Sequence, residues 1–202
     1  MAIADEHGLE ALSIRRLAKQ VGVTPMAIYW HVADKEALLQ ALGERMFSEV
    51  ELPPEGASWH EELSSLLAQI LRVLRRHPAV APLALFTILT SEPGLTVAER
   101  VLRLLMQAGF GEREAADAGV YLLSSIITLV TVEPGNQPSA DRELHEAKMA
   151  AKRARLAQIP AQRFPTVARL GEALLDCEDP DAYYERGLHM LVLGLRGLAA
   201  GA

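Results

Sequence analysis

An all-α fold is predicted from three observations on this chain of 202 residues. Half of the residues are apolar, and most of them recur at the three- and four-residue spacing that gives a helix one buried face. Strand signals are almost absent: the one β-branched run, 126–132, lies inside a longer helical pattern. Serine, threonine and aspartate precede several of these patterns, at positions where they cap helix N-termini.

Residues 13–21 predict a short amphipathic helix. Ser13 is a suitable N-cap, because its hydroxyl can accept an unpaired backbone N–H of the first turn. One face of this helix is apolar and consists of Ile14, Leu17, Ala18 and Val21. Gly22 then supplies the positive-φ residue that commonly ends a helix.

Two further helix starts follow directly. Thr24 would cap a second helix with Pro25 at its first position, where the missing N–H of proline costs nothing. Asp34 would cap a third helix, which turns apolar residues inward at Leu38, Leu42 and Met46. The second helix carries Tyr29, Trp30 and His31. An isolated aromatic pair at this spacing usually belongs to a core, but the caps and the glycine turn together favour an exposed surface made to lie in a DNA groove.

This arrangement resembles the helix-turn-helix of the tetracycline repressor (TetR) family. In that family the helix after the glycine turn enters the major groove, and the amino end of the next helix contacts phosphate. Carried over by position, the resemblance implies DNA contacts by Arg15, Thr24, Pro25, Met26, Ala27, Tyr29, Trp30, His31 and Lys35. The tetracycline-repressor pattern has a base-contacting glutamine where this chain has Pro25, so a different base sequence is expected.

Side-chain chemistry agrees with these roles. Arg15 is suited to a guanine edge, a contact that contributes about 1–3 kcal/mol of base discrimination. Met26 and Ala27 offer apolar contacts to thymine methyl groups. Phosphate oxygens, which position a protein without specifying sequence, suit Tyr29, His31 and Lys35.

Two domains are expected, a DNA-binding domain at 1–47 and an effector-binding and dimerisation domain at 48–202. Relative to the family the first helix is shortened, either by loss or because the start is assigned too late or trimmed. After a Pro-Pro-Glu-Gly break at 53–56, helices are expected at 58–77, up to about 90, at 96–107, 112–133 and about 181–199, with a turn at 92–94. Residues 134–165 are expected to form a long connection with a mobile helix around 141–158.

The second domain offers a candidate effector cavity. Its apolar set is Phe86, Ile88, Leu89, Met106, Phe110 and Tyr121, and a line of hydroxyls at Tyr121, Ser124, Thr128 and Thr131 would add polar contacts. These hydroxyls are equally expected to bond back to their own helix or to lie at an interface. With neither histidine nor arginine between 78 and 98, sensing of a tetracycline–magnesium chelate is not carried over. A small hydrophobic or aromatic effector is expected.

Helix 112–133 is apolar nearly all round, and such a helix must be covered on every side. The last helix carries three glycines on one face, and each costs up to about 1 kcal/mol unless another helix approaches closely. The resemblance implies that both helices pair with their copies in a homodimer. The interface would include Val120, Ile127, Gly187, Met190, Leu191, Gly194 and Leu198. The alternative is close packing within one chain.

Other classes are disfavoured. The six histidines lack metal-ligand spacing, Cys177 has no obvious activating neighbour, and acid pairs such as Glu61 and Glu62 are interpreted as solvated helix starts. We therefore expect no catalytic, metal or cofactor site. A net charge of −6 argues against a protein that coats nucleic acid. A single cysteine fits a reducing compartment, and a cytoplasmic bacterial location without membrane segment or signal peptide is expected.

The sequence therefore predicts a ligand-responsive transcriptional regulator, most often a repressor in this family, that binds a palindromic operator as a homodimer. The alternative is a helical small-molecule-binding protein that no longer binds DNA. An enzyme is the third hypothesis.

Overall fold

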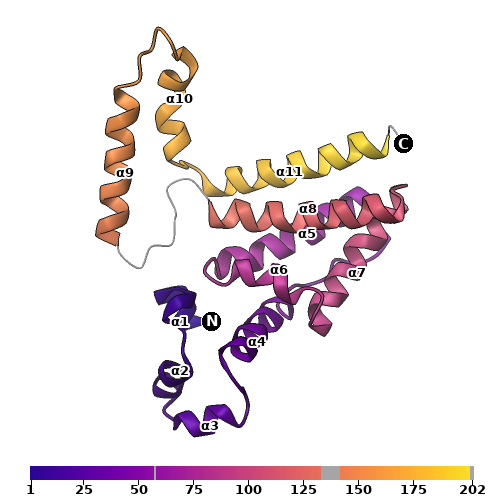
Figure 1. The fold of residues 1–202 in the computed structure, drawn as a ribbon. Helices are drawn as coiled ribbons and strands as arrows, with labels where there is room; N and C mark the ends of the chain where they lie inside the picture. The colour runs from indigo at the N-terminus through magenta and orange to yellow at the C-terminus, as the bar shows by residue number, and fades with distance from the viewer. Residues whose placement is uncertain (57, 133–141, 201–202) are drawn as a thin grey trace.

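The computed structural model describes residues 1–56, 58–132 and 142–200, with the backbone alone for 142–145. Every regular element in these residues is a helix, as predicted. Figure 1 shows α1 to α3 at one end of the molecule, α5 to α8 in the middle, and α11 running along α8.

The first 47 residues contain α1 (Ala2–His7), the 3-10 turn η1 (Leu9–Ala11), α2 (Ile14–Val21), α3 (Pro25–Tyr29) and α4 (Lys35–Phe47). Ser13, Thr24 and Asp34 cap α2, α3 and α4, since the side chain of each accepts a backbone N–H three residues later. Gly22 adopts the left-handed conformation with φ of 77°. The helix starts inferred from the sequence are therefore confirmed.

The remaining chain forms one helical body and one hairpin. Its elements are α5 (Trp59–Arg76), η2 (Ala81–Leu83), α6 (Ala84–Thr87), α7 (Glu92–Gln107), α8 (Glu112–Thr131), α9 (Arg142–Ala157), α10 (Pro165–Leu175) and α11 (Pro180–Ala199). α5, α7 and α8 pack against one another, and α11 packs on α5 and α8. α4 reaches this body through contacts with η2, α5, α6 and α7.

The predicted turn at 92–94 is wrong, because these residues form the first turn of α7. Proline is tolerated there, since the first-turn N–H groups have no partner within the helix. The hydroxyl of Ser91 accepts the N–H of Gly94 at 3.2 Å. A Cβ on Gly94 would lie 2.5 Å from the carbonyl oxygen of Ile88, so the tight corner between α6 and α7 requires glycine.

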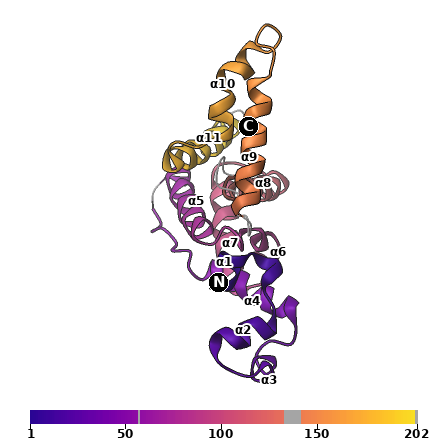
Figure 2. The same ribbon diagram turned by 90° about the vertical axis from the view of Figure 1, so that its left-hand side faces the viewer.

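α10 was not predicted. The expected helix around 141–158 corresponds to α9, while residues 134–141 of the expected connection, and residue 133 at the end of the expected helix 112–133, lie outside the described residues. α9 and α10 pack against each other as a hairpin, with Gly171 against the side chain of Leu156. Figures 1 and 2 show this hairpin standing out from the α5–α8 body.

α8 is a core helix. Leu122, Ile126 and Val130 on one face are almost fully buried, and the helix packs against α5, α7 and α11. By length and composition alone α8 would be long and apolar enough to span a membrane, as would η2 to α7 taken as one bent span. The expectation that α8 is covered on every side is not met within this chain, because Val120 and Tyr121 are exposed.

A buried ion pair joins α5 to α7, and its arginine also contacts the linker before α5. Arg100 is 8% and Glu62 is 5% exposed, and Arg100 Nε lies 2.5 Å from Glu62 Oε1. The same guanidinium also bonds Glu55 and donates to the Pro53 carbonyl at 3.0 Å. A hydrogen bond from Arg103, together with the charges of Arg100 and Arg103, lowers the pKa of Glu55 below its usual value. The linker is therefore held against α7 by charge.

α1 is tied to the same body. His77, which ends α5, has Nδ1 at 2.9 Å from Asp5 Oδ2 and Nε2 at 3.8 Å from Glu49 Oε2. Ile3 and Ala4 of α1 are buried in the common core. The short first helix thus packs on the body through both apolar and polar contacts.

Candidate nucleic-acid interface and effector pocket

α3 presents its aromatic side chains outward. Trp30 is 84% and Tyr29 is 50% exposed, and Met26 is exposed beside them. The alternative that these aromatics belong to a core does not hold in the structure. Ala27 and Ile28 are half-buried, so α3 is anchored by one side while its other side faces away from the body (Figure 1).

Basic side chains surround this exposed helix. Arg15, Arg16 and Lys19 are exposed on α2, which packs against α3, and Lys35 is exposed at the start of α4. Among the described residues none of these four has an ion-pair partner, and the one acid between 13 and 35, Asp34, caps α4. The patch is therefore locally positive on a chain of net charge −6.

The structure brings the nine predicted DNA-contacting residues onto one end of the molecule. Arg15 lies on α2, Thr24 to Tyr29 on the capped start and body of α3, Trp30 and His31 directly after it, and Lys35 in the first turn of α4. All are exposed except the half-buried Ala27.

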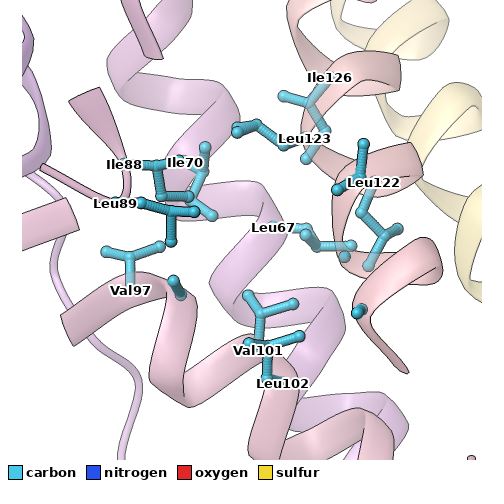
Figure 3. A pocket seen from close by; sticks show the side chains of 14 residues that line it. Leu67, Ile70, Ile88, Leu89, Val97, Val101, Leu102, Leu122, Leu123 and Ile126 are labelled. Atoms are coloured by element: carbon cyan, nitrogen blue, oxygen red, sulfur yellow. The ribbon is translucent and has the colours of Figure 1, made fainter. Parts of the chain in front are cut away.

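An apolar pocket lies at the centre of the helical body (Figure 3). It has a cavity volume of about 200 Å³ and is lined from α5, from the segment after α6, from α7 and from α8. The lining residues share apolar side chains or none: Leu67, Ile70, Ile88, Leu89, Val97, Ala98, Val101, Leu102, Ala116, Gly119, Val120, Leu122, Leu123 and Ile126. Pockets with apolar walls of this kind bind small ligands in many proteins.

Two of the predicted effector residues, Ile88 and Leu89, line this pocket. Phe110 and Tyr121 line a different groove, between α8 and α11, and Phe86 and Met106 are exposed on the surface. The sequence did not indicate the lining residues of α5 and α7. Their apolar stripes are visible in the sequence, but which stripe borders a cavity depends on how the helices cross.

The predicted hydroxyl line does not reach the pocket. Thr128 Oγ1 donates to the Ser124 carbonyl at 2.8 Å, and Thr131 Oγ1 donates to the Ile127 carbonyl at 2.9 Å. Both bonds stay within α8, which is the alternative left open from the sequence. Tyr121 is exposed in the α8–α11 groove.

The α8–α11 groove holds most of the predicted dimer residues. Met190, Leu191, Gly194 and Leu198 line it together with Tyr121, and a Cβ on Gly194 would meet nothing within 4 Å. The other three lie elsewhere. Val120 lines the apolar pocket, Ile127 is buried, and Gly187 packs against Leu129 of the same chain, where a Cβ would come within 2.9 Å of the side chain.

In the described part of the chain, no group of three or more His, Cys, Asp or Glu side chains is placed to hold a metal ion. Cys177 is half-buried. The two acids predicted to be solvated behave differently: Glu61 is exposed and closes a capping box with Ser58, which lowers its pKa, whereas Glu62 is buried on Arg100. For Glu62 the prediction is wrong, because an arginine 38 positions along the chain neutralises it in the core.

Comparison with known proteins agrees with the geometry. Residues 1–42 match the family model described as bacterial regulatory proteins of the tetR family. Residues 52–199 match the model of the tetracyclin repressor-like C-terminal domain. The chain belongs to the TetR family of transcriptional regulators. TetR-family relatives are regulators rather than enzymes.

Individual relatives extend over nearly the whole chain. An HTH-type transcriptional regulator of Saccharopolyspora erythraea is 31% identical over 198 residues, 98% of this chain and 81% of the relative. The class D tetracycline repressor of Escherichia coli is 27% identical over 199 residues, 96% of this chain and 84% of that protein. Both alignments include the helix-turn-helix and the helical body.

Solved structures share the fold. The TetR family protein ActR of Streptomyces coelicolor, in complex with actinorhodin, superposes with a TM-score of 0.77 at 27% identity, covering 98% of this chain and 93% of that chain. BioQ of Mycobacterium smegmatis has a TM-score of 0.65 at 21% identity, covering 97% and 92%. The two-part helical arrangement is therefore the TetR fold.

Proposed function

We propose that this chain is a ligand-responsive repressor that binds a palindromic operator as a homodimer in the bacterial cytoplasm and leaves it when a small hydrophobic effector binds. The observation that carries the proposal is the outward-facing α3, a capped helix whose Trp30 and Tyr29 are exposed among basic side chains without ion-pair partners. An exposed indole forgoes the favourable free energy that burial of its apolar surface would give. A surface function therefore accounts for the exposed Trp30 better than core packing does.

In this proposal residues 1–47 are the DNA-binding domain and residues 48–202 bind effector and the second copy. Arg15 and the Thr24–Ala27 segment contact base edges, while Tyr29, Trp30, His31 and Lys35 contact the backbone. A two-fold dimer presents two such surfaces, and half-sites are expected about 34 Å apart, one turn of the double helix. The effector pocket is the apolar cavity between α5, α7 and α8.

Arg15→Ala should weaken operator binding by about 10- to 100-fold, since a bidentate arginine–guanine contact contributes about 1–3 kcal/mol. The operator is first selected by the protein from random duplexes, and affinity is then measured by fluorescence anisotropy. Arg113→Ala is the matched control, because Arg113 is an exposed arginine on α8 paired with Asp117. Equal affinities of the two variants would remove Arg15 from the interface. If the selection enriches no duplex, the result favours the alternative, a helical ligand-binding protein that does not bind DNA.

The path from pocket to DNA is proposed to run through the contact of α6 with α4. Ile88 and Leu89 line the pocket directly after α6, and Thr87, buried just before them, packs on α4. A Cβ on Gly43 would lie 2.3 Å from Thr87 Oγ1, so the Thr87 side chain packs directly on the backbone of α4 at Gly43. Any shift of residues 88–89 around a ligand is thereby passed to α4, which leads back to α3.

A polar contact links the same two segments. Gln40 Nε2 donates to Thr90 Oγ1 at 2.8 Å and to the Thr90 carbonyl at 3.2 Å. For a ligand that releases the operator from the unmodified chain, Gln40→Ala should reduce the change in operator affinity, with an expected coupling loss of about 0.5–2 kcal/mol. Operator titrations with and without ligand measure this loss. Gln107→Ala, at the end of α7, is the control, and identical coupling in both variants would contradict the path.

A further inference from the structure

The walls of the apolar pocket carry no polar side chain. All side chains drawn in Figure 3 are hydrocarbon, and the fourteen residues that line the pocket are leucine, isoleucine, valine, alanine and glycine. Hydroxyls of neighbouring residues are engaged elsewhere: Thr87 Oγ1 donates to the Leu83 carbonyl, and Thr128 Oγ1 donates within α8. A ligand in this pocket therefore meets almost entirely carbon and no polar side chain.

Such walls select by chemistry. A hydroxyl or amide that enters without a hydrogen-bond partner loses its hydration uncompensated, whereas each apolar group gains from leaving water. An engineered cavity of about 150 Å³ lined by Leu, Ile and Phe stays dry and binds benzene or xenon. The pocket of about 200 Å³ described here has the same chemistry and is slightly larger.

Small residues on two helices create the space. Ala98 on α7 and Ala116 and Gly119 on α8 all border the pocket. A Cβ on Gly119 would already lie 3.2 Å from Leu102 Cδ2, so that wall is tight, while Ala98 borders the cavity with a side chain of one carbon. The exposed Leu89 and Val120 also line the pocket, so its opening lies beside them.

We infer that the pocket binds an uncharged monocyclic hydrocarbon of about the size of toluene or xylene, and that Ala98 and Leu102 set this size limit. The inference rests on the proposed role of the pocket as effector site and narrows it to a ligand without hydrogen-bonding groups. A hydroxylated polycyclic ligand is excluded on two grounds, because it is too large for the cavity and its hydroxyls would find no partner.

Toluene and phenol test the polarity of the site, since they differ mainly in a methyl replaced by a hydroxyl. Binding to the full-length chain is measured by calorimetry and by ligand-detected NMR. Toluene is expected to bind at least about tenfold more tightly than phenol. This ratio corresponds to the low end of the free-energy cost of burying a hydroxyl without a hydrogen-bond partner. Phenol binding as tightly as toluene, or no detectable toluene binding, would overturn the inference.

Substitutions test the site and its size. Ala98→Leu should abolish toluene binding by filling the cavity, whereas Leu102→Ala should admit naphthalene, which the unmodified chain rejects. Ala151→Leu, at an exposed position of α9, is the matched control for added hydrophobicity and should leave toluene binding unchanged. If Ala98→Leu does not fold, Val101→Thr replaces it: this nearly isosteric change adds a hydroxyl to the wall and should narrow the toluene–phenol ratio. An unchanged ratio and unchanged size limit would contradict the assignment.

Operator affinity, measured separately on the same samples, distinguishes this inference from the proposed function. In one outcome toluene binds, Ala98→Leu blocks this binding, and the bound operator is not released. That outcome supports the ligand class and contradicts effector-controlled repression. An operator that is bound but responds only to polar compounds supports repression and overturns the ligand class.

Discussion

Replacing Arg100 with alanine should destabilise the folded protein by about 3–5 kcal/mol, the range measured when one partner of a buried ion pair is removed. Arg100 and Glu62 are both nearly inaccessible to water. Without the guanidinium, the carboxylate of Glu62 stays buried with its charge uncompensated. The Pro53 carbonyl loses its donor as well. The free energy of unfolding is measured by urea titration followed by circular dichroism.

Arg103→Ala is the matched control on the same helix. Arg103 contacts Glu55, which is exposed, and an exposed pair contributes about 0–1 kcal/mol. A second comparison uses the double variant Arg100→Met and Glu62→Leu, which should recover most of the lost stability, because replacing both members of a buried pair by apolar groups is often neutral. Equal losses for Arg100→Ala and Arg103→Ala would show that burial of the pair does not determine its contribution.

This ion pair also marks a limit of sequence reasoning. Glu62 stands beside Glu61 near a helix start, where two acids usually face water and favour the helix dipole. Glu61 faces water, but Glu62 lies on the adjacent face of α5, which packs against α7. Arg100 lies opposite Glu62 only because α7 packs on α5. A local sequence pattern around Glu62 cannot predict a partner 38 positions away.

Local signals determined α2, α3 and α4, and there the prediction succeeded. Caps and the left-handed glycine at 22 act within four residues, so their geometry follows from neighbouring side chains. α10 is the contrary case. It packs on α9 and leaves Val167, Leu170 and Leu174 exposed, and its short apolar stripe is weak next to the prolines and charges on either side.

The prediction of the candidate pocket was incomplete, and the reason differs from that for α10. Ile88 and Leu89 were identified because they lie in an apolar segment without basic residues, which is a property of composition. The α8 residues chosen from the same sequence were hydroxyl-bearing, whereas the face that borders the cavity carries Gly119, Val120 and Leu123. Which face of an apolar helix lines a cavity depends on how three helices and the segment after α6 cross, and the sequence of one helix does not contain that information.

The proposed dimer predicts that a charge in the α8–α11 groove will prevent two copies from assembling. Leu198 is 64% exposed in the α8–α11 groove, next to Met190 and Gly194. A second copy seated on this groove would bury these side chains and cover Gly194, where an added Cβ would meet no other part of the described chain within 4 Å. Leu198→Glu should then leave a monomer, because a carboxylate at the centre of an apolar interface loses its hydration without a partner.

Operator affinity should fall with the dimer. Two recognition helices on one rigid dimer bind a palindrome with a gain of about 10²–10⁴ over a single module, and a monomer forfeits that gain. Sedimentation velocity gives the mass, and anisotropy on the selected operator gives the affinity. Leu193→Glu is the matched control, because Leu193 is 46% exposed on the same helix but faces the groove toward α5.

The two measurements separate assembly from folding. A Leu198→Glu chain that is folded, monomeric and weak on the palindrome, yet keeps the affinity of the unmodified monomer for a single half-site, has lost only the second copy. If Leu198→Glu and Leu193→Glu stay dimeric with equal operator affinity, the α8–α11 groove is not the interface, and the exposed apolar residues there require another partner. α8 also borders the proposed effector pocket through Gly119 and Leu123. A dimer built on the other face of α8 would place ligand and second copy on opposite sides of one helix. Rotation of α8 would then link effector binding to the spacing of the two α3 helices.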